Sequence, residues 1–286
     1  MSYERTVVLP DSGAGIDVTR GSLLFIGTAT VLLRYAGFTI LTDPNFLHRG
    51  EFVYLGFGMK SERVMEPAME LKDLPPIDIV VLSHLHEDHF DRFVANHLAK
   101  STPIVTTPKA AQALRKMQFT KVYALSTWAA LTLKKNAQQV HITSLPGRHG
   151  PGIVAKALPP VMGSMLEFGA EGQNATLRLY ISGDTLVYKD LQEIPKRYPD
   201  IDLGLLHLGG TTLLGIVVTM DAKQGVEAMK LIHPRKVVPI HFNDYTVFKS
   251  PLGDFRQAVA DAKLEDRVHY LRHGETYTFE VPIGEK

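Results

Sequence analysis

The 286-residue sequence contains no cysteine. This absence excludes disulfides, thiolate-bound metal clusters and a cysteine nucleophile. Any transition metal must therefore be held by imidazole and carboxylate groups. The absence says little about the compartment, because cytosolic proteins also lack disulfides.

The sequence also lacks long apolar runs and an excess of charge of one sign. No stretch of about 18 apolar residues occurs, so we expect no membrane span, and the first residues, MSYERTVVLPDSGAGID, do not resemble a signal peptide. The 31 basic and 30 acidic residues give a formal net charge of +1, so no strong field would attract nucleic acid or an anionic membrane. The default expectation is a cytoplasmic protein that acts on a small-molecule substrate.

Short β-prone runs alternate with helical segments along most of the chain. The pattern predicts strands at 23–26, 30–35, 38–42, 77–82, 104–106, 122–125, 130–133, 139–144, 164–168, 176–181, 203–206, 237–240, 268–271 and 276–281. It predicts helices at 62–73, 90–100, 108–117, 187–197, 221–232 and 253–263, and irregular segments at 45–61 and 146–163.

These elements form two successive sets of strands, each accompanied by helices. Two such sets can pack as two sheets face to face with helices outside, a four-layer α/β arrangement. Residues 1–20 are polar and predict an N-terminal arm, and no linker interrupts the rest, so residues 21–286 are expected to form a single domain.

Metal-ligand residues are concentrated in one run, His84-Leu85-His86-Glu87-Asp88-His89. In an extended segment, His84 and His86 point to the same face, and the run directly follows a predicted strand. Neutral imidazole and carboxylate suit zinc, iron or manganese. The alternative is a solvated polar loop, but three histidines and an aspartate at this spacing favour a metal site.

Three more ligand-type residues each lie just past a β-run and close to Gly or Pro: His149, Asp184 and His241. Such positions are where α/β and sandwich folds place functional residues. Taken alone, His149 or His241 is more often a structural histidine. Together with the run at 84–89, the three argue for two metal ions.

The run HLHEDH resembles the HxHxDH signature of the metallo-β-lactamase fold, and His149, Asp184 and His241 match its remaining ligand positions in order. The resemblance spans about residues 20–280 and implies an αββα sandwich with the site at one edge of both sheets. It implies that one ion is held by His84, His86 and His149 and the other by Asp88, His89 and His241, with Asp184 bridging.

A hydrolase with this resemblance would use a metal-bridging hydroxide as its nucleophile, with Asp88 and Asp184 among the catalytic residues. The two divalent ions are expected to be zinc, with manganese or iron as alternatives. The resemblance also implies that Asp43, in LTDP, orients a ligand histidine. The alternative for Asp43 is a turn cap before Pro44.

Two further residues are candidates by position. His207 follows a predicted strand and could protonate a leaving group, or it could be structural. Arg148 adjoins His149 and could bind a phosphate or carboxylate, or lie in an exposed loop.

The segments TILTDP, SHLHEDHFD, SGDT and PIHF resemble a narrower branch that contains N-acyl-phosphatidylethanolamine phospholipase D and the ascorbate-phosphate lactonase. This resemblance implies hydrolysis of a phosphodiester in a small or lipophilic substrate, with a lactone or another acyl bond as the alternative. The segment LLHLGG at 205–210 departs from the phospholipase. A non-catalytic binding protein and a di-iron redox protein are the remaining alternatives.

Two irregular segments, 52–59 and 158–163, are unusually apolar. They either line the mouth of a site suited to an acyl chain, or pack on the core or on a second subunit. The second option leaves a homo-oligomer open.

Overall fold

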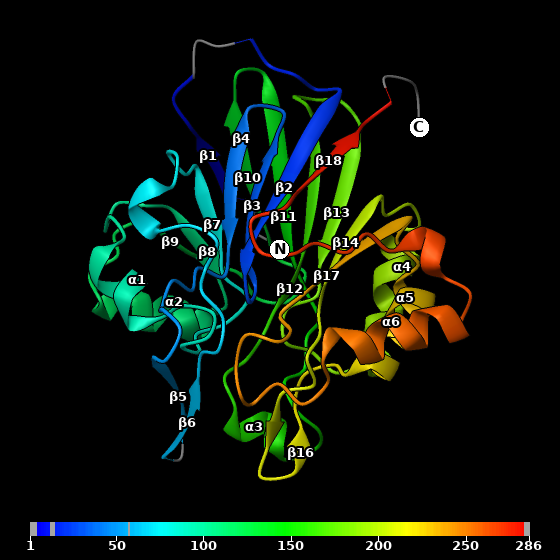
Figure 1. The fold of residues 1–286 in the computed structure, drawn as a ribbon. Helices are drawn as coiled ribbons and strands as arrows, with labels where there is room; N and C mark the ends of the chain where they lie inside the picture. The colour runs from blue at the N-terminus through cyan, green and yellow to red at the C-terminus, as the bar shows by residue number, and fades with distance from the viewer. Residues whose placement is uncertain (1–4, 12–14, 57, 283–286) are drawn as a thin grey trace.

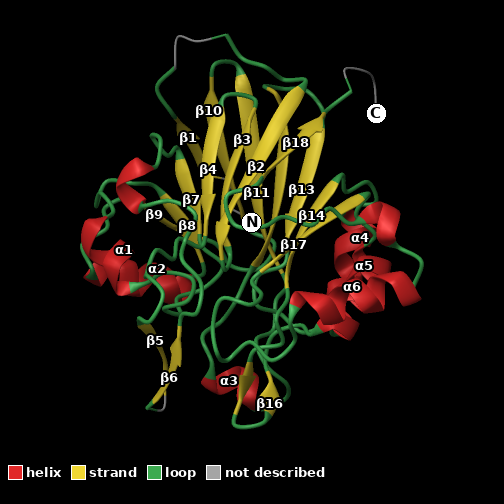
Figure 2. Ribbon diagram, viewed as in Figure 1, coloured by secondary structure: helices red, strands yellow, loops and turns green. Residues whose placement is uncertain are grey.

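Two mixed β-sheets pack face to face, and each carries helices on its outer face (Figures 1 and 2). The computed structural model describes residues 5–11, 15–56 and 58–282. Among these residues, no helix combines the length and the apolar character needed to cross a membrane.

The first sheet has seven strands in the order β18-β2-β3-β4-β7-β8-β9. Their bounds are β2 Arg20–Gly27, β3 Thr30–Tyr35, β4 Phe38–Thr42, β7 Ile79–Val81, β8 Ile104–Thr106, β9 Val122–Ala124 and β18 Thr276–Glu280. Strands β4, β7, β8 and β9 run parallel to one another, and the outer face is covered by α1 (Arg92–His97) and α2 (Pro108–Lys116).

The second sheet also has seven strands, in the order β1-β10-β11-β12-β13-β14-β17. Their bounds are β1 Arg5–Val8, β10 Ala130–Lys135, β11 Gln138–Leu145, β12 Gly163–Ala170, β13 Leu177–Ile181, β14 Leu203–His207 and β17 Lys236–Ile240. Its outer face carries α4 (Glu193–Arg197), α5 (Ala222–Ile232) and α6 (Leu252–Asp261).

Three smaller elements project from one end of the sandwich (Figure 1). They are a hairpin of β5 (Phe52–Gly56) and β6 (Met59–Glu62), the short helix α3 (Val154–Ala157), and a hairpin of β15 (Thr212–Leu213) and β16 (Ile216–Val217). The 3₁₀ turns are η1 (Leu71–Asp73), η2 (Lys189–Gln192) and η3 (Glu265–Arg267).

Two of the helices begin directly after a residue whose side chain caps the first turn. Pro108 opens α2 behind Thr107, whose hydroxyl oxygen accepts from the backbone of Ala110. Asp221 caps α5 in the same way, by accepting from the backbone N–H of Gln224.

Three buried apolar clusters fill the spaces between successive layers. This packing confirms the four-layer αββα sandwich. The largest lies between the two sheets and includes Phe25, Leu131 and Leu166. A second cluster packs the second sheet against its helices through Phe255, and a third packs the first sheet against α1 and α2 through Leu114. Central strands such as β3 are buried along nearly their whole length because both faces are covered.

Two predicted elements are wrong. The helix predicted at 62–73 is absent apart from the 3₁₀ turn η1, because Pro67 interrupts the segment and residues up to Glu62 pair in β6. The strand predicted at 268–271 is reduced to one isolated bridge between Val268 and Val237.

Part of the predicted N-terminal arm pairs with the second sheet. Arg5–Val8 pairs in parallel with β10 at the edge of the second sheet, although its side chains are largely exposed. Residues 1–4 and 12–14 of the predicted arm lie outside the described residues.

Candidate metal centre

The predicted ligands meet because strands of both sheets end at one edge. Strands β11, β13 and β17 share one direction, so the loops after them carry His149, Asp184 and His241 to the same place. The loop after β7 brings the run at 84–89 from the other sheet. All seven residues lie in two clusters whose ligand atoms are within 4.8 Å of one another inside each cluster.

The first group consists of His84, His86 and His149. His84 Nε2 lies 3.0 Å from His86 Nδ1, and the ring centroids of His84 and His149 are 5.1 Å apart. Burial, followed by the neighbouring histidines, holds the pKa of His84 well below its usual value, and burial lowers the pKa of His86 to about 4. These imidazoles are therefore neutral near pH 7, which is the form that binds a metal.

The second group consists of Asp88, His89, Asp184 and His241. His89 Nε2 lies 3.4 Å from Asp184 Oδ1, and His241 Nε2 lies 3.4 Å from Asp88 Oδ2. Burial opposes a charge on Asp88, but the nearby His89 and His241 together outweigh it and lower the Asp88 pKa to about 2. Burial likewise disfavours a charge on His89, yet the nearby carboxylates raise the His89 pKa well above its usual value.

The second group holds buried polar atoms that have no hydrogen-bond partner among the described residues. These buried atoms are Asp88 Oδ1, His89 Nε2, Asp184 Oδ1 and His241 Nε2. Leaving a buried polar group unsatisfied costs about 1–3 kcal/mol. A divalent cation would satisfy all four, so this donor set fits a metal site.

Contacts on the outer ring nitrogens orient the histidines. His149 Nδ1 lies 2.9 Å from the carbonyl oxygen of Val218, and His241 Nδ1 lies 3.1 Å from that of Leu208. Each contact fixes the tautomer and leaves Nε2 with its lone pair free.

Asp43 contacts two histidines at the candidate centre and the residue before His84. Its Oδ1 accepts from the backbone N–H of Ser83 at 2.6 Å, and its Oδ2 accepts from the Ser83 hydroxyl at 2.9 Å. His89 Nδ1 and His207 Nε2 lie 3.1 and 3.2 Å from the same Oδ2. Asp43 also has a φ of +33°, a strained backbone of the kind that persists at functional sites.

His207 is not placed to protonate a leaving group. Its side chain is fully buried, Nε2 faces Asp43, and Nδ1 lies 3.2 Å from Ser182 Oγ. Both ring nitrogens therefore have protein partners, and neither is free to meet a substrate. Position alone left proton donation and a structural role equally open, because the direction of a side chain at a strand end depends on the neighbouring strands.

Arg148 also has a partner within the protein. The centre of its guanidinium lies 4.4 Å from the ring centroid of Tyr188, a cation–π contact. Tyr188 packs against the apolar cluster between the second sheet and its helices. The buried Nε of Arg148 has no hydrogen-bond partner in the part of the chain that the structure describes.

Sequence reasoning missed Thr219, whose hydroxyl donates to Asp184 Oδ2 at 2.8 Å. This bond turns Oδ1 of Asp184 towards His89 and His241. Nothing in the local sequence around Thr219 predicts the contact, because Asp184 lies 35 residues earlier in the chain.

A buried cation supports the loop that carries His241. Arg63 is fully buried, donates to Asn45 and lies 3.8 Å from Asp244. Asp244 accepts from the backbone N–H of Thr28 at 3.0 Å, and the Thr28 carbonyl accepts from the backbone N–H of His241 at 2.5 Å. This chain of contacts holds His241 in its left-handed conformation, with a φ of +60°.

The two apolar segments next to the centre pack mainly on the protein. Val53, Leu55 and Leu158 belong to a small buried cluster that also includes Leu213 and Val218. Residue 57 lies outside the described residues.

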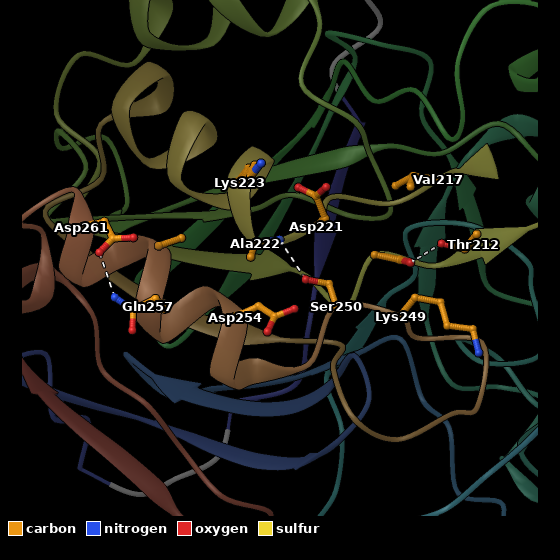
Figure 3. A pocket seen from close by; sticks show the side chains of 12 residues that line it. Thr212, Val217, Asp221, Ala222, Lys223, Lys249, Ser250, Asp254, Gln257 and Asp261 are labelled. Carbon is orange, nitrogen blue, oxygen red and sulfur yellow. Dashed lines mark hydrogen bonds between the residues drawn. The ribbon is translucent and has the colours of Figure 1, made fainter. Parts of the chain in front are cut away.

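A surface cavity of about 520 Å³ lies beside the β15–β16 hairpin and the starts of α5 and α6 (Figure 3). Its lining includes Asp221, Lys249 and Asp254. None of the predicted site residues lines this cavity.

The sandwich and the histidine–aspartate cluster at its edge define a protein of the metallo-β-lactamase fold. Residues 39–242 match the family model described as Beta-lactamase superfamily domain, and the chain belongs to this superfamily.

Known proteins extend this similarity over most of the chain. A UPF0173 metal-dependent hydrolase of Nanoarchaeum equitans is 22% identical over 206 residues, which are 72% of this chain and 87% of that protein. The structure of an isothiocyanate hydrolase from Delia radicum gut bacteria matches 91% of this chain and 99% of its own, with a TM-score of 0.74 and 23% identity. A possible metal-dependent hydrolase from Veillonella parvula matches with a TM-score of 0.75 and 22% identity, over 92% of this chain and 100% of its own.

Proposed function

We propose that this protein is a metal-dependent hydrolase that holds two divalent ions. Two observations support this proposal: the seven predicted ligands converge in two adjoining groups, and four buried atoms of the second group have no hydrogen-bond partner among the described residues. The first group would hold one ion and the second group the other, with Asp184 between them. The names of the relatives, metal-dependent hydrolases, support the same class of activity.

Two bound ions would lower the pKa of a shared water and polarise a substrate oxygen, which makes zinc, manganese or iron suitable. The protein's own groups prepare this chemistry. The hydroxyl of Thr219 donates a hydrogen bond to the Asp184 carboxylate, and the Asp43 carboxylate contacts Nδ1 of His89. We assign His207 a positioning role, since it contacts the same oxygen of Asp43 as His89 does and so restrains that carboxylate.

For the substrate we propose a phosphodiester in a small or lipophilic molecule, as the resemblance to the phospholipase and lactonase branch implies. The exposed Phe52 and Tyr54, beside the loop that carries the run at 84–89, support a lipophilic group. A lactone or another acyl bond is the second candidate, because the same centre would polarise a carbonyl oxygen.

Metal analysis of the purified protein tests the centre. We expect close to two ions per chain in the parent protein and a loss of metal and activity in Asp184→Ala. Asp254→Ala is the matched control, because Asp254 lines the surface cavity and not the centre. Metal-free protein under metal-replete conditions, or an Asp184→Ala variant with full metal content, would contradict the proposal.

A panel of phosphodiesters, lactones and thioesters, assayed with zinc, manganese and iron, tests the substrate class. Arg148→Ala should harm an anionic phosphodiester far more than a neutral lactone if the guanidinium meets the phosphate. Equal losses on both substrates would show that Arg148 acts only through its packing on Tyr188.

A further inference from the structure

Asn45 lies in the loop that follows β4 and is fully buried. Its side-chain Nδ2 donates to the backbone carbonyl of Glu87 at 2.9 Å. Its Oδ1 accepts from the hydroxyl of Tyr245 at 2.9 Å and from Nη1 of Arg63 at 2.5 Å. One buried carboxamide therefore joins segments that lie 42 and 200 residues further along the chain. We call these contacts the Asn45 link.

The two ends of the Asn45 link reach two loops that both supply ligands to the second group. Glu87 directly precedes Asp88, in the run that comes from the first sheet. Tyr245 follows His241 in the loop after β17 of the second sheet. Ring packing continues from Tyr245 to that ligand: the centroid of Phe248 lies 5.7 Å from that of Tyr245 and 4.4 Å from that of His241.

The first group depends less on this link. Its ligands come from the run and from the loop after β11, and the ring of His149 is oriented by the segment that follows β16. The second group takes Asp88 and His89 from one of the linked loops and His241 from the other. A change at Asn45 should therefore disturb the second group more than the first.

The partners of Asn45 require a carboxamide at this position. The carbonyl of Glu87 can only accept a hydrogen bond, and the guanidinium of Arg63 can only donate one. The side chain between them must therefore present a donor on one side and an acceptor on the other. Ionised aspartate, which has the same size, offers only acceptors, and leucine offers neither.

A buried cation strengthens one end of the link. Arg63 is fully buried, and it pairs with Tyr245 through an isolated β-bridge. Its Nη1 also donates to the backbone carbonyl of Asn45 at 3.1 Å. Hydrogen bonds from a charged donor are roughly twice as strong as neutral ones. Asn45 is therefore held firmly to the loop of Tyr245, and its bond to Glu87 extends this restraint to the run.

We propose that Asn45 is a positioning residue of the candidate metal centre, whose carboxamide sets the spacing between the run and the loop that carries His241. Its effect on the second ion rests on the proposed two-ion function. The restraint itself belongs to the metal-free chain, because every contact that forms the link joins two protein groups.

Asn45→Asp tests the link, because it keeps the acceptor for Arg63 but places a second acceptor opposite the carbonyl of Glu87. We expect the affinity for the second ion to fall about tenfold to a hundredfold, with the affinity for the first ion unchanged. An added carboxylate would by itself attract both ions, so a loss confined to the second ion reports the lost donor. Titration of the full chain with Co²⁺, followed by visible absorbance and chelator competition, gives both affinities. The absorption missing from His241→Ala identifies the ion of the second group.

A second variant and a control accompany Asn45→Asp. Tyr245→Phe removes one hydroxyl from the link and keeps the ring, so it should weaken the same ion by a smaller factor. Asp78→Ala is the matched control. Asp78 lies at the other end of β7 from the run, where it accepts from the backbone N–H of Thr39 at 2.8 Å and pairs with Lys135 at 2.9 Å. The control should lower the melting temperature and retain both Co²⁺ affinities.

Hydrogen exchange on the metal-free proteins separates this proposal from the proposed function. Exchange of the backbone amides at 241–248 should rise in Asn45→Asp and stay at the parent level in Asp78→Ala. Unchanged exchange in Asn45→Asp, unchanged affinity for the second ion, or an equal loss of both ions overturns the positioning role, as does a control that loses the second ion to the same extent. A parent protein that binds fewer than two ions refutes the two-ion function, and the exchange at 241–248 then decides the link alone. If Asn45→Asp does not fold, the same measurements on Tyr245→Phe decide.

Discussion

Gly209 offers a direct test of how tightly the loop carrying His241 is held. Gly209 has a φ of +103°, and a Cβ added there would lie 2.5 Å from the carbonyl oxygen of His241. Gly209→Ala therefore requires a left-handed alanine and a displacement of a predicted metal ligand. We expect the variant to lose stability and to lose metal from the second group.

The magnitude follows from two terms. A left-handed conformation costs an L residue about 1–2 kcal/mol, and overpacking of a closed site costs about 1–3 kcal/mol. The sum is about 2–5 kcal/mol. With about 2.1 cal/mol/K of unfolding entropy per residue, the melting temperature should fall by about 3–8 °C for this chain.

Gly215→Ala is the matched control, because Gly215 has a φ of +79° but nothing within 4 Å of an added Cβ. It should lose only the conformational term, about 1–2 kcal/mol, and keep its metal. Thermal melts and metal analysis of both variants provide the comparison. Equal losses of stability with equal metal contents would refute the reasoning that Gly209 is required by its contact with His241.

The other predictions concern protons and hydrogen bonds at the centre. The carboxylates raise the pKa of His89 above its usual value, so an ion that binds the second group must displace a proton. The affinity of the second group for metal therefore rises with pH. At the first group the histidine pKa values are lowered, so an ion there competes less with protons. Dialysis at pH 6 rather than pH 8 should therefore empty the second group first, and metal analysis that shows both ions lost together would contradict this. Thr219→Val removes the bond to the Asp184 carboxylate and should cost about 1–3 kcal/mol and weaken metal binding, whereas Thr212→Val, in the second hairpin, should leave metal binding unchanged. His207→Gln keeps a donor towards Asp43 and should retain most activity, while His207→Leu should lose metal affinity. If the pH–rate profile loses one limb in both variants, His207 is instead the general acid that protonates the leaving group.

The sequence by itself determined the class of fold and the set of candidate ligand residues. The run at 84–89 places four ligand-type side chains within six residues, so their convergence depends on local geometry alone. The alternation of β-runs and helical segments likewise predicts layers, because each element must bury its own apolar face. Helices such as Ala222–Ile232 agree closely with the predicted range, since capping and periodicity are local properties.

Only the tertiary structure decided how the ends of the chain and the surroundings of the centre are arranged. Thr276–Glu280 returns to pair with β2, and Arg5–Val8 joins β10, pairings over more than a hundred residues that no local pattern encodes. The orientation of His207 depends on Asp43, 164 residues away, and that of Asp184 on Thr219. Short-range periodicity predicts which residues lie at the end of each strand, but the direction in which each side chain points depends on partners that folding brings from distant segments.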